Sequence, residues 1–158
     1  MTPDRLPIAE LSARSYASED RAACLALFDS NVPEFFAPSE RSEYCNFLDE
    51  LRCAYLVLGS PREGIVAAGG YYVTEEANLG ALAWGLVSRG WQRCGVGSEL
   101  LQTRLALLRA SSVNAVRVRT SPRSRGFFEH SGFRFVRLIP QGFAKSDLVE
   151  LRLELPAG

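Results

Sequence analysis

Apolar residues recur along this chain at two spacings, and these divide it into expected strands and helices. Between positions 44 and 51 they stand at i, i+3, i+4 and i+7, which is one face of a helix, whereas residues 151–155 alternate as a half-buried strand does. Ser18 and Ser39 precede the first two helical patterns, where serine is a favoured N-cap. The expected strands cover residues 7–16, 54–58, 64–73, 81–87, 113–120, 133–139 and 148–155, and the expected helices cover 18–30, a segment opened by Ser39, 96–110 and 124–131.

The order of these elements is β-α-α-β-β-β-α-β-α-β-β. No internal repeat, low-complexity tract or linker interrupts the sequence. A chain of 158 residues fits one domain and is long enough to bury a core. We therefore expect a single α/β (α+β) domain over residues 7–155.

The bulk composition excludes several classes of protein. Apolar content of 47% and charged content of 23% are ordinary for a globular domain. No apolar run approaches the roughly 18 residues that cross a bilayer, and the first residues do not resemble a secretory signal, so a cytoplasmic protein is expected. The four cysteines contain no C-x-x-C pair and His130 is the only histidine, so we predict neither a metal site nor a disulfide framework.

The net charge is zero, but the two signs of charge are concentrated in different parts of the sequence. Residues 1–87 carry thirteen acidic residues against six arginines, and residues 88–137 carry ten arginines against two glutamates. A basic segment favours a polyanionic ligand, and an acidic half suits a cationic one such as an amine. Solvated faces with an uneven share of charges are the alternative explanation.

A glycine-bearing turn between an apolar strand and a helix is the strongest chemical signal in the sequence. Without a Cβ, Gly95 and Gly97 let a ligand approach main-chain N–H groups at the positive end of the helix dipole, which suits an anion such as pyrophosphate. The turn lacks the Lys-Ser/Thr of a P-loop and the third glycine of a dinucleotide fingerprint. A turn that merely starts a helix remains the alternative. The residues of the turn are Gln92, Arg93, Cys94, Gly95, Val96, Gly97 and Ser98.

Together with two later segments, this turn resembles the acyl-coenzyme A site of the GNAT superfamily of N-acetyltransferases. The later segments are Thr-Ser-Pro-Arg-Ser at 120–124 and Phe-Phe-Glu-His-Ser-Gly-Phe at 127–133. The resemblance covers residues 7–155 and implies a GNAT-like fold, with a central mixed, twisted sheet of about seven strands and about four flanking helices. It also implies acetyl-CoA as co-substrate, no metal, and direct attack of an amine on the thioester without a covalent enzyme intermediate.

The resemblance further implies where the pantetheine arm lies. In this fold two parallel strands part, here those at 81–87 and 113–120, and the arm lies between them. Main-chain groups of Gly85, Leu86 and Val87 would pair with the arm. A bulge in the strand would point a backbone N–H, that of Leu86, at the thioester carbonyl as an oxyanion hole.

The same resemblance assigns the remaining cofactor contacts. The turn from Gln92 to Ser98 would hold the pyrophosphate. Ser121 stands where many relatives have an asparagine that touches the cofactor, and its side chain is shorter. Cys94 lies inside the turn, and two interpretations of it remain: a small residue that the turn tolerates, or a reactive thiol.

The sequence departs from the family at the residue that usually serves as the general acid. Phe128 stands where relatives carry the tyrosine that protonates the leaving thiolate. A well-placed acid contributes about 10²–10⁴-fold, but a thiol of pKa about 8.5 leaves tolerably as its anion. We expect Tyr72 to replace the tyrosine, ahead of Ser124 and Ser131, since strand 64–73 should border the cleft. A tyrosine packed on the sheet is the alternative.

No general base is obvious in the sequence. Glu34 or the pair at 75–76 would deprotonate an ammonium directly or through water, and a plain surface charge is the alternative for each. The connection 31–38 is expected to recognise the acceptor, which would be a small amine or a peptide amine. Arg117 and Arg119 would hold an acceptor carboxylate if their strand face opens into the cleft.

Two functions from other classes remain open. A catalytically weak acyl-CoA-binding regulatory domain is favoured by Phe128 and by the lack of a carboxylate on strand 81–87. Nucleic-acid binding through the arginines of 88–137 is opposed by the acidic first half and the absence of lysine runs. We expect an amine partner, no nucleic acid and no membrane; the oligomeric state is open, a homodimer being one option.

Overall fold

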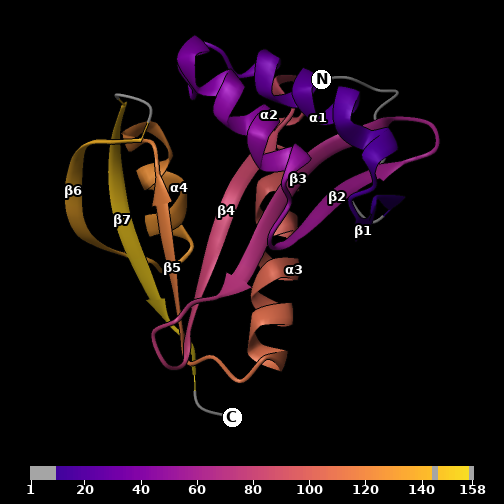
Figure 1. The fold of residues 1–158 in the computed structure, drawn as a ribbon. Coiled ribbons are helices and arrows are strands. Elements are labelled where there is room, and N and C mark those ends of the chain that lie inside the picture. Colours follow the sequence, from indigo (N-terminus) through magenta and orange to yellow (C-terminus); the bar gives the residue numbers. More distant parts are fainter. Residues whose placement is uncertain (1–9, 144–145, 157–158) are drawn as a thin grey trace.

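A seven-stranded mixed sheet forms the centre of the molecule, in the order β1-β2-β3-β4-β5-β7-β6 (Figure 1). The computed structural model describes residues 10–143 and 146–156. The strands are β1 (Ser12–Ser15), β2 (Ala54–Ser60), β3 (Gly64–Val73), β4 (Leu79–Val87), β5 (Ala115–Thr120), β6 (Arg134–Phe143) and β7 (Ser146–Glu154). The helices are α1 (Arg21–Ser30), α2 (Arg41–Asp49), α3 (Val96–Ala110) and α4 (Arg125–His130). The predicted order and class are confirmed; the first strand is shorter than expected, and residues 7–9 of its range lie outside the described residues.

Helices α1 and α2 begin with the same local structure, which differs from the predicted one. Short 3-10 turns, η2 (Ser18–Asp20) and η3 (Pro38–Glu40), precede them. The carboxylate at the third position of each turn accepts a hydrogen bond from the N–H that precedes the turn, and it also lies at the positive end of the helix dipole. Ser18 and Ser39 lie inside these turns, so their prediction as N-caps was wrong. The donor–acceptor pairs are Ala17–Asp20 at 2.8 Å and Ala37–Glu40 at 2.6 Å.

Asp20 also ties β1 to the start of α1. Its buried carboxylate accepts two hydrogen bonds from the Arg14 guanidinium, at 2.7 and 2.9 Å. These bonds lower the pKa of Asp20 below its ordinary value of 3.8. A carboxylate with a lowered pKa in the folded state contributes stability that is present above its unfolded pKa and lost as the pH falls through the folded value.

We therefore expect Asp20→Asn to lower the free energy of unfolding by about 1–2 kcal/mol at pH 7. Urea titrations at pH 7 and at a series of lower pH values check this, because the gap to the wild type should close as the native carboxylate is protonated. Glu19→Gln is the matched control, since the neighbouring side chain is exposed; it should shift stability by about 0.5 kcal/mol or less. A loss of equal size at all of these pH values would contradict the role of the charge.

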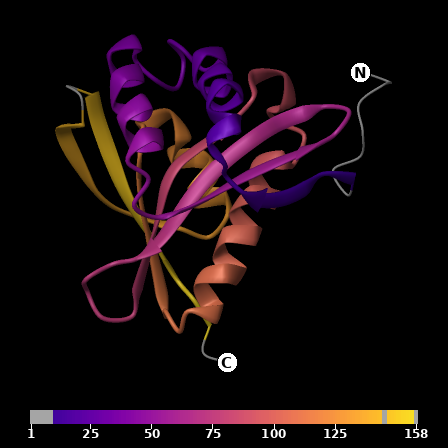
Figure 2. The same cartoon turned by 45° about the vertical axis from the view of Figure 1, so that its right-hand side comes forward.

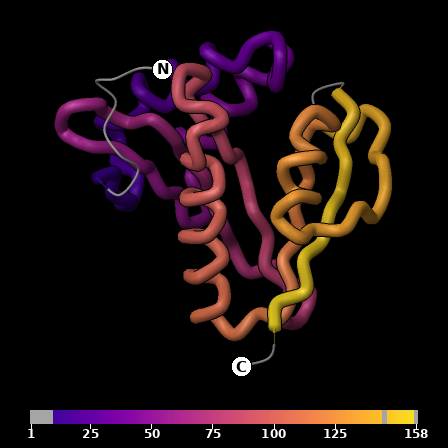
Figure 3. The backbone as a smooth tube through the Cα atoms, turned by 180° about the vertical axis from the view of Figure 1, so that it is seen from behind, coloured from indigo at the N-terminus to yellow at the C-terminus, as the bar shows by residue number. Residues whose placement is uncertain are grey.

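Different helices cover the two faces of the sheet. Helices α1 and α2 lie over one face, at the upper end of the strands in Figure 2, and α3 and α4 lie on the other, which the view from behind shows (Figure 3). The apolar stripe of α3 is buried between that helix and the strands, with Leu101 and Leu108 fully buried. On the other face Phe28 and Tyr44 are fully buried between the first two helices and β2–β4.

Strands β4 and β5 are parallel neighbours that pair only over their first residues. Leu79–Ala81 pairs with Ala115–Arg117. Beyond this point β4 remains paired with β3, and β5 with β7, so the two strands part toward their carboxyl ends (Figure 1). In the described sheet, the edge of β4 that faces β5 is therefore without a strand partner over residues 82–87.

Candidate active site

Strand β4 contains a bulge where it has parted from β5. The register with β3 shifts between Ala68 and Gly70, so Trp84 and Gly85 together face a single residue of β3. Trp84 has a φ of +45°, which few non-glycine residues adopt. Because a bulge interrupts the alternation of side chains, the neighbours Ala83 and Trp84 both line one cleft, while Gly85 faces α3. The predicted bulge is present, and its role as an oxyanion hole at Leu86 stays a prediction.

Hydrogen bonds and aromatic packing hold this bulge in place. The Tyr55 hydroxyl donates to the Trp84 carbonyl at 2.8 Å, and the Tyr44 hydroxyl lies 2.8 Å from that of Tyr55. Burial raises the pKa of Tyr55 well above its ordinary value, so it remains a donor. The Trp84 ring lies 4.9 Å from the ring of Tyr44 and 5.9 Å from that of Phe36. A strained residue fixed this firmly points to a functional position.

The glycine turn between β4 and α3 presents its main chain to solvent. Gly95 has a φ of +85° and immediately precedes the helix. The Glu99 N–H donates to the Gly95 carbonyl at 3.0 Å, and the N–H groups ahead of it in the first turn have no acceptor within the helix. Arg93 and Ser98 are exposed beside Gly95, whereas Val96 is fully buried and anchors the turn. The turn therefore fits an anion such as a pyrophosphate.

Two residues of the turn face the protein. The Gln92 amide nitrogen donates to Asn31 Oδ1 and, at 3.3 Å, to the Val87 carbonyl. Asn31 is buried and also donates to that carbonyl, at 2.9 Å. Cys94 packs against the core below the turn, and its thiol donates to the Gln92 carbonyl at 3.4 Å. Both side chains brace the turn, so any contact of Gln92 with a ligand would come from its main chain.

A buried guanidinium lies beneath the bulge. Arg104, in the middle of α3, is 3% exposed. Its Nη1 donates to the Gly70 carbonyl at 3.2 Å, and its Nε lies 3.5 Å from the Leu100 carbonyl. Its Nη2 is 3.2 Å from the point where a Cβ on the exposed Gly85 would stand, and its Cζ is 2.9 Å from that point on Gly69. Two glycines thus leave the room that this cation occupies.

Among the described residues, no carboxylate forms an ion pair with Arg104. Burial lowers the pKa of Arg104 from 12.5 to about 10, against an opposing effect of Tyr55. The group is charged at neutral pH, and a buried charge without a counter-ion is costly. From the sequence, Arg104 was only one arginine of the basic segment, and its buried position was not predicted. The available signal was its spacing, four residues from both Leu100 and Leu108 on the apolar stripe of α3.

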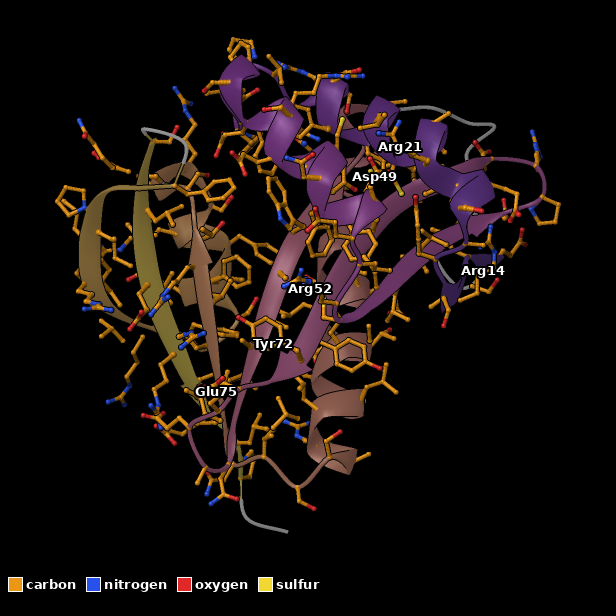
Figure 4. The ribbon with its side chains drawn as sticks, in the orientation of Figure 1. Arg14, Arg21, Asp49, Arg52, Tyr72 and Glu75 are labelled. Atoms are coloured by element: carbon orange, nitrogen blue, oxygen red, sulfur yellow. The ribbon has the colours of Figure 1, made fainter. Side chains whose placement is uncertain are left out.

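A cleft of about 490 Å³ opens on the opposite face of β3 and β4, beneath α2. One face of α2 borders it, with residues at i, i+3, i+4 and i+7. Figure 4 shows Tyr72 and Arg52, which both line the cleft, on the same side of the sheet below α2. This face of α2 was not predicted from the sequence to line a site. The lining residues on α2 are Glu43, Asn46 and Phe47, Glu50 lines the cleft directly after the helix, and those on the strands include Tyr72, Ala83, Trp84 and Phe143.

Of the predicted acid and base, only Tyr72 lines this cleft. It is 38% exposed, and its hydroxyl accepts a hydrogen bond from Arg117 Nη2 at 3.3 Å, which leaves the phenol proton free to be donated. Glu34 forms an ion pair with Arg89 at 3.0 Å and is not among the lining residues. Glu75 lies at the end of β3 remote from α2 (Figure 4). The roles of Tyr72 and Glu34 stay predictions.

The other predicted positions lie around the parted strands. Ser121 follows β5, and its Oγ lies 3.5 Å from that of Ser124. Phe128 is 8% exposed and packs edge-on against Phe133. In the connection 31–38, the Phe36 ring packs on the rings of the core rather than lining the cleft.

Two features that would suggest other classes of site were not found in the described part of the chain. Residues 10–143 and 146–156 contain no cluster of three or more side chains able to hold a metal ion. No helix in the same residues combines the length and the apolar character needed to cross a bilayer.

Comparisons with known proteins match this arrangement to one family. The model of the Acetyltransferase (GNAT) family matches residues 22–133. A GNAT-family structure from Desulfovibrio desulfuricans is similar at a TM-score of 0.78 and 20% identity, over 92% of this chain and 99% of that one. Ard1 from Thermoplasma volcanium is similar at 0.75 and 15%, over 94% and 99%. The ribosomal-protein-S18-alanine N-acetyltransferase from Escherichia coli is similar at 0.72 and 15%, over 94% and 96%. No curated protein sequence matches the chain.

Proposed function

The chain belongs to the GNAT family of acetyltransferases, and we propose that it transfers an acetyl group from acetyl-CoA to the primary amine of a small molecule or peptide. One juxtaposition carries the proposal. We call the glycine turn of residues 92–98, which fits an anion, the anion turn. The unpaired edge of β4 connects this exposed anion turn, the bulge at Trp84 and the cleft beneath α2. A phosphate group, a thioester and an amine would thus have adjoining sites.

The described residues fit a coenzyme A molecule at two places. The first-turn N–H groups of α3 and the exposed Arg93 would hold the pyrophosphate, at the positive end of the helix dipole. The open edge of β4 at Gly85, Leu86 and Val87 would pair with the amide groups of the pantetheine arm as a missing strand would. At Val87 this pairing would use the N–H, because the carbonyl already accepts from Asn31 and Gln92. Ser121, at the end of β5, would border the same arm from the other side.

The bulge would direct the chemistry at the thioester. The backbone N–H of Leu86, the residue that follows the Trp84–Gly85 bulge, would donate to the carbonyl oxygen as negative charge develops on it. Arg104 lies beneath this backbone and would add a fixed positive charge without touching the substrate. Because both groups are held before the substrate arrives, little reorganisation is needed when the charge forms.

Acetyl transfer requires a neutral amine. A carboxylate at the cleft, Glu43 or Glu50, would take the ammonium proton directly or through water. The amine nitrogen would then form a bond to the carbonyl carbon while the bond from that carbon to sulfur breaks, and the nitrogen would lose its second proton to solvent. The leaving thiolate would take a proton from Tyr72 or from solvent. Products are the acetylated amine and coenzyme A.

A second candidate function has one observation in its favour. Phe128 offers a buried phenyl group where relatives have a tyrosine, which would suit a domain that binds acyl-CoA without turnover.

Acetyl-CoA is to be incubated with the folded protein and a panel of primary amines, with thiol release and amide mass measured together. Amine-dependent release of one thiol per amide supports the transferase. Binding of acetyl-CoA without amide would support the regulatory domain, and absence of binding would reject both.

A further inference from the structure

We infer that the cleft beneath α2 selects amines whose ammonium group is attached to an aromatic or bulky apolar body and that carry no carboxylate beside the nitrogen. The inference rests on the proposed acetyl transfer and names its acceptor class. The cleft is separate from the anion turn, which lies beyond the carboxyl end of β4.

Aromatic rings form one wall of the cleft. The Trp84 ring lies 6.1 Å from the ring of Phe47 and meets Phe143 edge-on at 5.5 Å. The three rings come from β4, α2 and β6, so they form a corner rather than a single stack. Such faces bind apolar groups and also attract ammonium ions. A volume of about 490 Å³ is ample for a single-ring amine.

Carboxylates form the rim above these rings. Glu43 lies on the face of α2 that borders the cleft, Glu50 directly follows the helix, and both are exposed. Within the described residues, Glu43 is part of no ion pair, and Glu50 has only a loose contact of 3.8 Å with the exposed Arg52. A cation would therefore be attracted to the rim, and an anion repelled.

The arginines near the cleft are poorly placed to hold a carboxylate. Arg52 is 87% exposed and already lies beside Glu50. Arg117 donates to the Tyr72 hydroxyl. The carboxylate of an amino acid would therefore lie against two glutamates, and no arginine would pair with it firmly. The matching amine would bring only its positive charge, which the glutamates attract.

The position of Trp84 connects this preference to the reaction. Trp84 is both the bulge residue and the wall of the cleft. An aromatic body packed on its ring would hold the attached nitrogen close to the proposed oxyanion hole. A short alkylamine would lack this packing and lose orientation at the thioester.

The test compares 2-phenylethylamine, phenylalanine and ethylamine as acceptors at saturating acetyl-CoA. We expect kcat/KM for 2-phenylethylamine to exceed that for either other amine by at least about tenfold. Calorimetric titration of 2-phenylethylamine into the protein saturated with coenzyme A provides a readout without turnover. Equal or better use of phenylalanine or ethylamine, or no binding of 2-phenylethylamine to the coenzyme A complex, would overturn the inference. Failure of coenzyme A itself to bind would instead reject the proposed function.

Glu43→Gln tests the rim directly. We expect it to raise KM for 2-phenylethylamine about five- to tenfold and to leave the Kd for acetyl-CoA unchanged. Asp49→Asn is the matched control, because it removes one charge from the same helix at a residue that pairs with Arg21 and does not line the cleft. An equal effect of the two substitutions, or none from Glu43→Gln, would count against the carboxylate rim.

Discussion

A Gly95→Arg variant is expected to lose at least about 100-fold in affinity for acetyl-CoA, measured by calorimetric titration. Two effects combine at this position. Gly95 adopts a φ of +85°, which L-residues rarely tolerate, so a side chain strains the turn that aims the N–H groups. The new side chain would also occupy the exposed space where the pyrophosphate is proposed to lie.

Gly64→Arg is the control that separates the effect of backbone strain from the effect of blocking the proposed pyrophosphate site. Gly64, the first residue of β3 after the turn from β2, also has a positive φ, +71°, and nothing lies within 4 Å of its would-be Cβ. It therefore carries the same kind of backbone penalty far along the chain from the anion turn. We expect similar losses in melting temperature for the two variants and lost binding for Gly95→Arg alone. Equal binding by both variants would place the coenzyme A site elsewhere.

An Arg104→Met variant is expected to lower kcat about 10- to 100-fold and to change the Kd for acetyl-CoA little. The Coulomb energy between unit charges about 7 Å apart, at an effective dielectric constant of about 20, is about 2 kcal/mol, or roughly thirtyfold in rate. This charge would stabilise both the carbonyl oxygen and the leaving sulfur as they become negative. It would thereby offset the missing tyrosine at Phe128.

A stability measurement and a spectroscopic one separate this role from simple packing. Methionine removes a buried charge, so we expect the melting temperature not to fall steeply. The thiol of bound coenzyme A, followed by thiolate absorbance, should ionise at a lower pH in the wild type than in Arg104→Met. Arg109→Met, at an exposed position of the same helix, is the control and should change neither quantity. Unchanged kcat and thiol ionisation in Arg104→Met would contradict the proposed role.

Features set by local spacing could be predicted from the sequence. The bounds of α3 and β3 match the expected ones because an uninterrupted apolar pattern lies between clear turn residues. The turn before α3 could be predicted for the same reason, since Gly95 supplies the positive φ that its geometry requires. The resemblance to the family then predicted that the strands beside this turn would part.

Features that depend on distant partners could not be predicted. The side chain of Gln92 faces Asn31, 61 residues away, which no local pattern indicates. The burial of Arg104 depends on Gly69 of β3 and Gly85 of β4, so its position in the basic segment of the sequence did not indicate it. The carboxylate rim was missed because only the apolar stripe of α2 was followed, whereas Glu43 on the neighbouring face and Glu50 just after the helix border the cleft.

The most direct test of the account is an amide NMR titration of the isotope-labelled protein with coenzyme A. We predict that the amides of the β4 edge and of the anion turn shift together and saturate at one ligand per chain. The signals to follow are those of Gly85, Leu86, Gly95 and Gly97. Shifts confined to residues outside both segments, or none from a folded protein, would contradict a cofactor site between the parted strands.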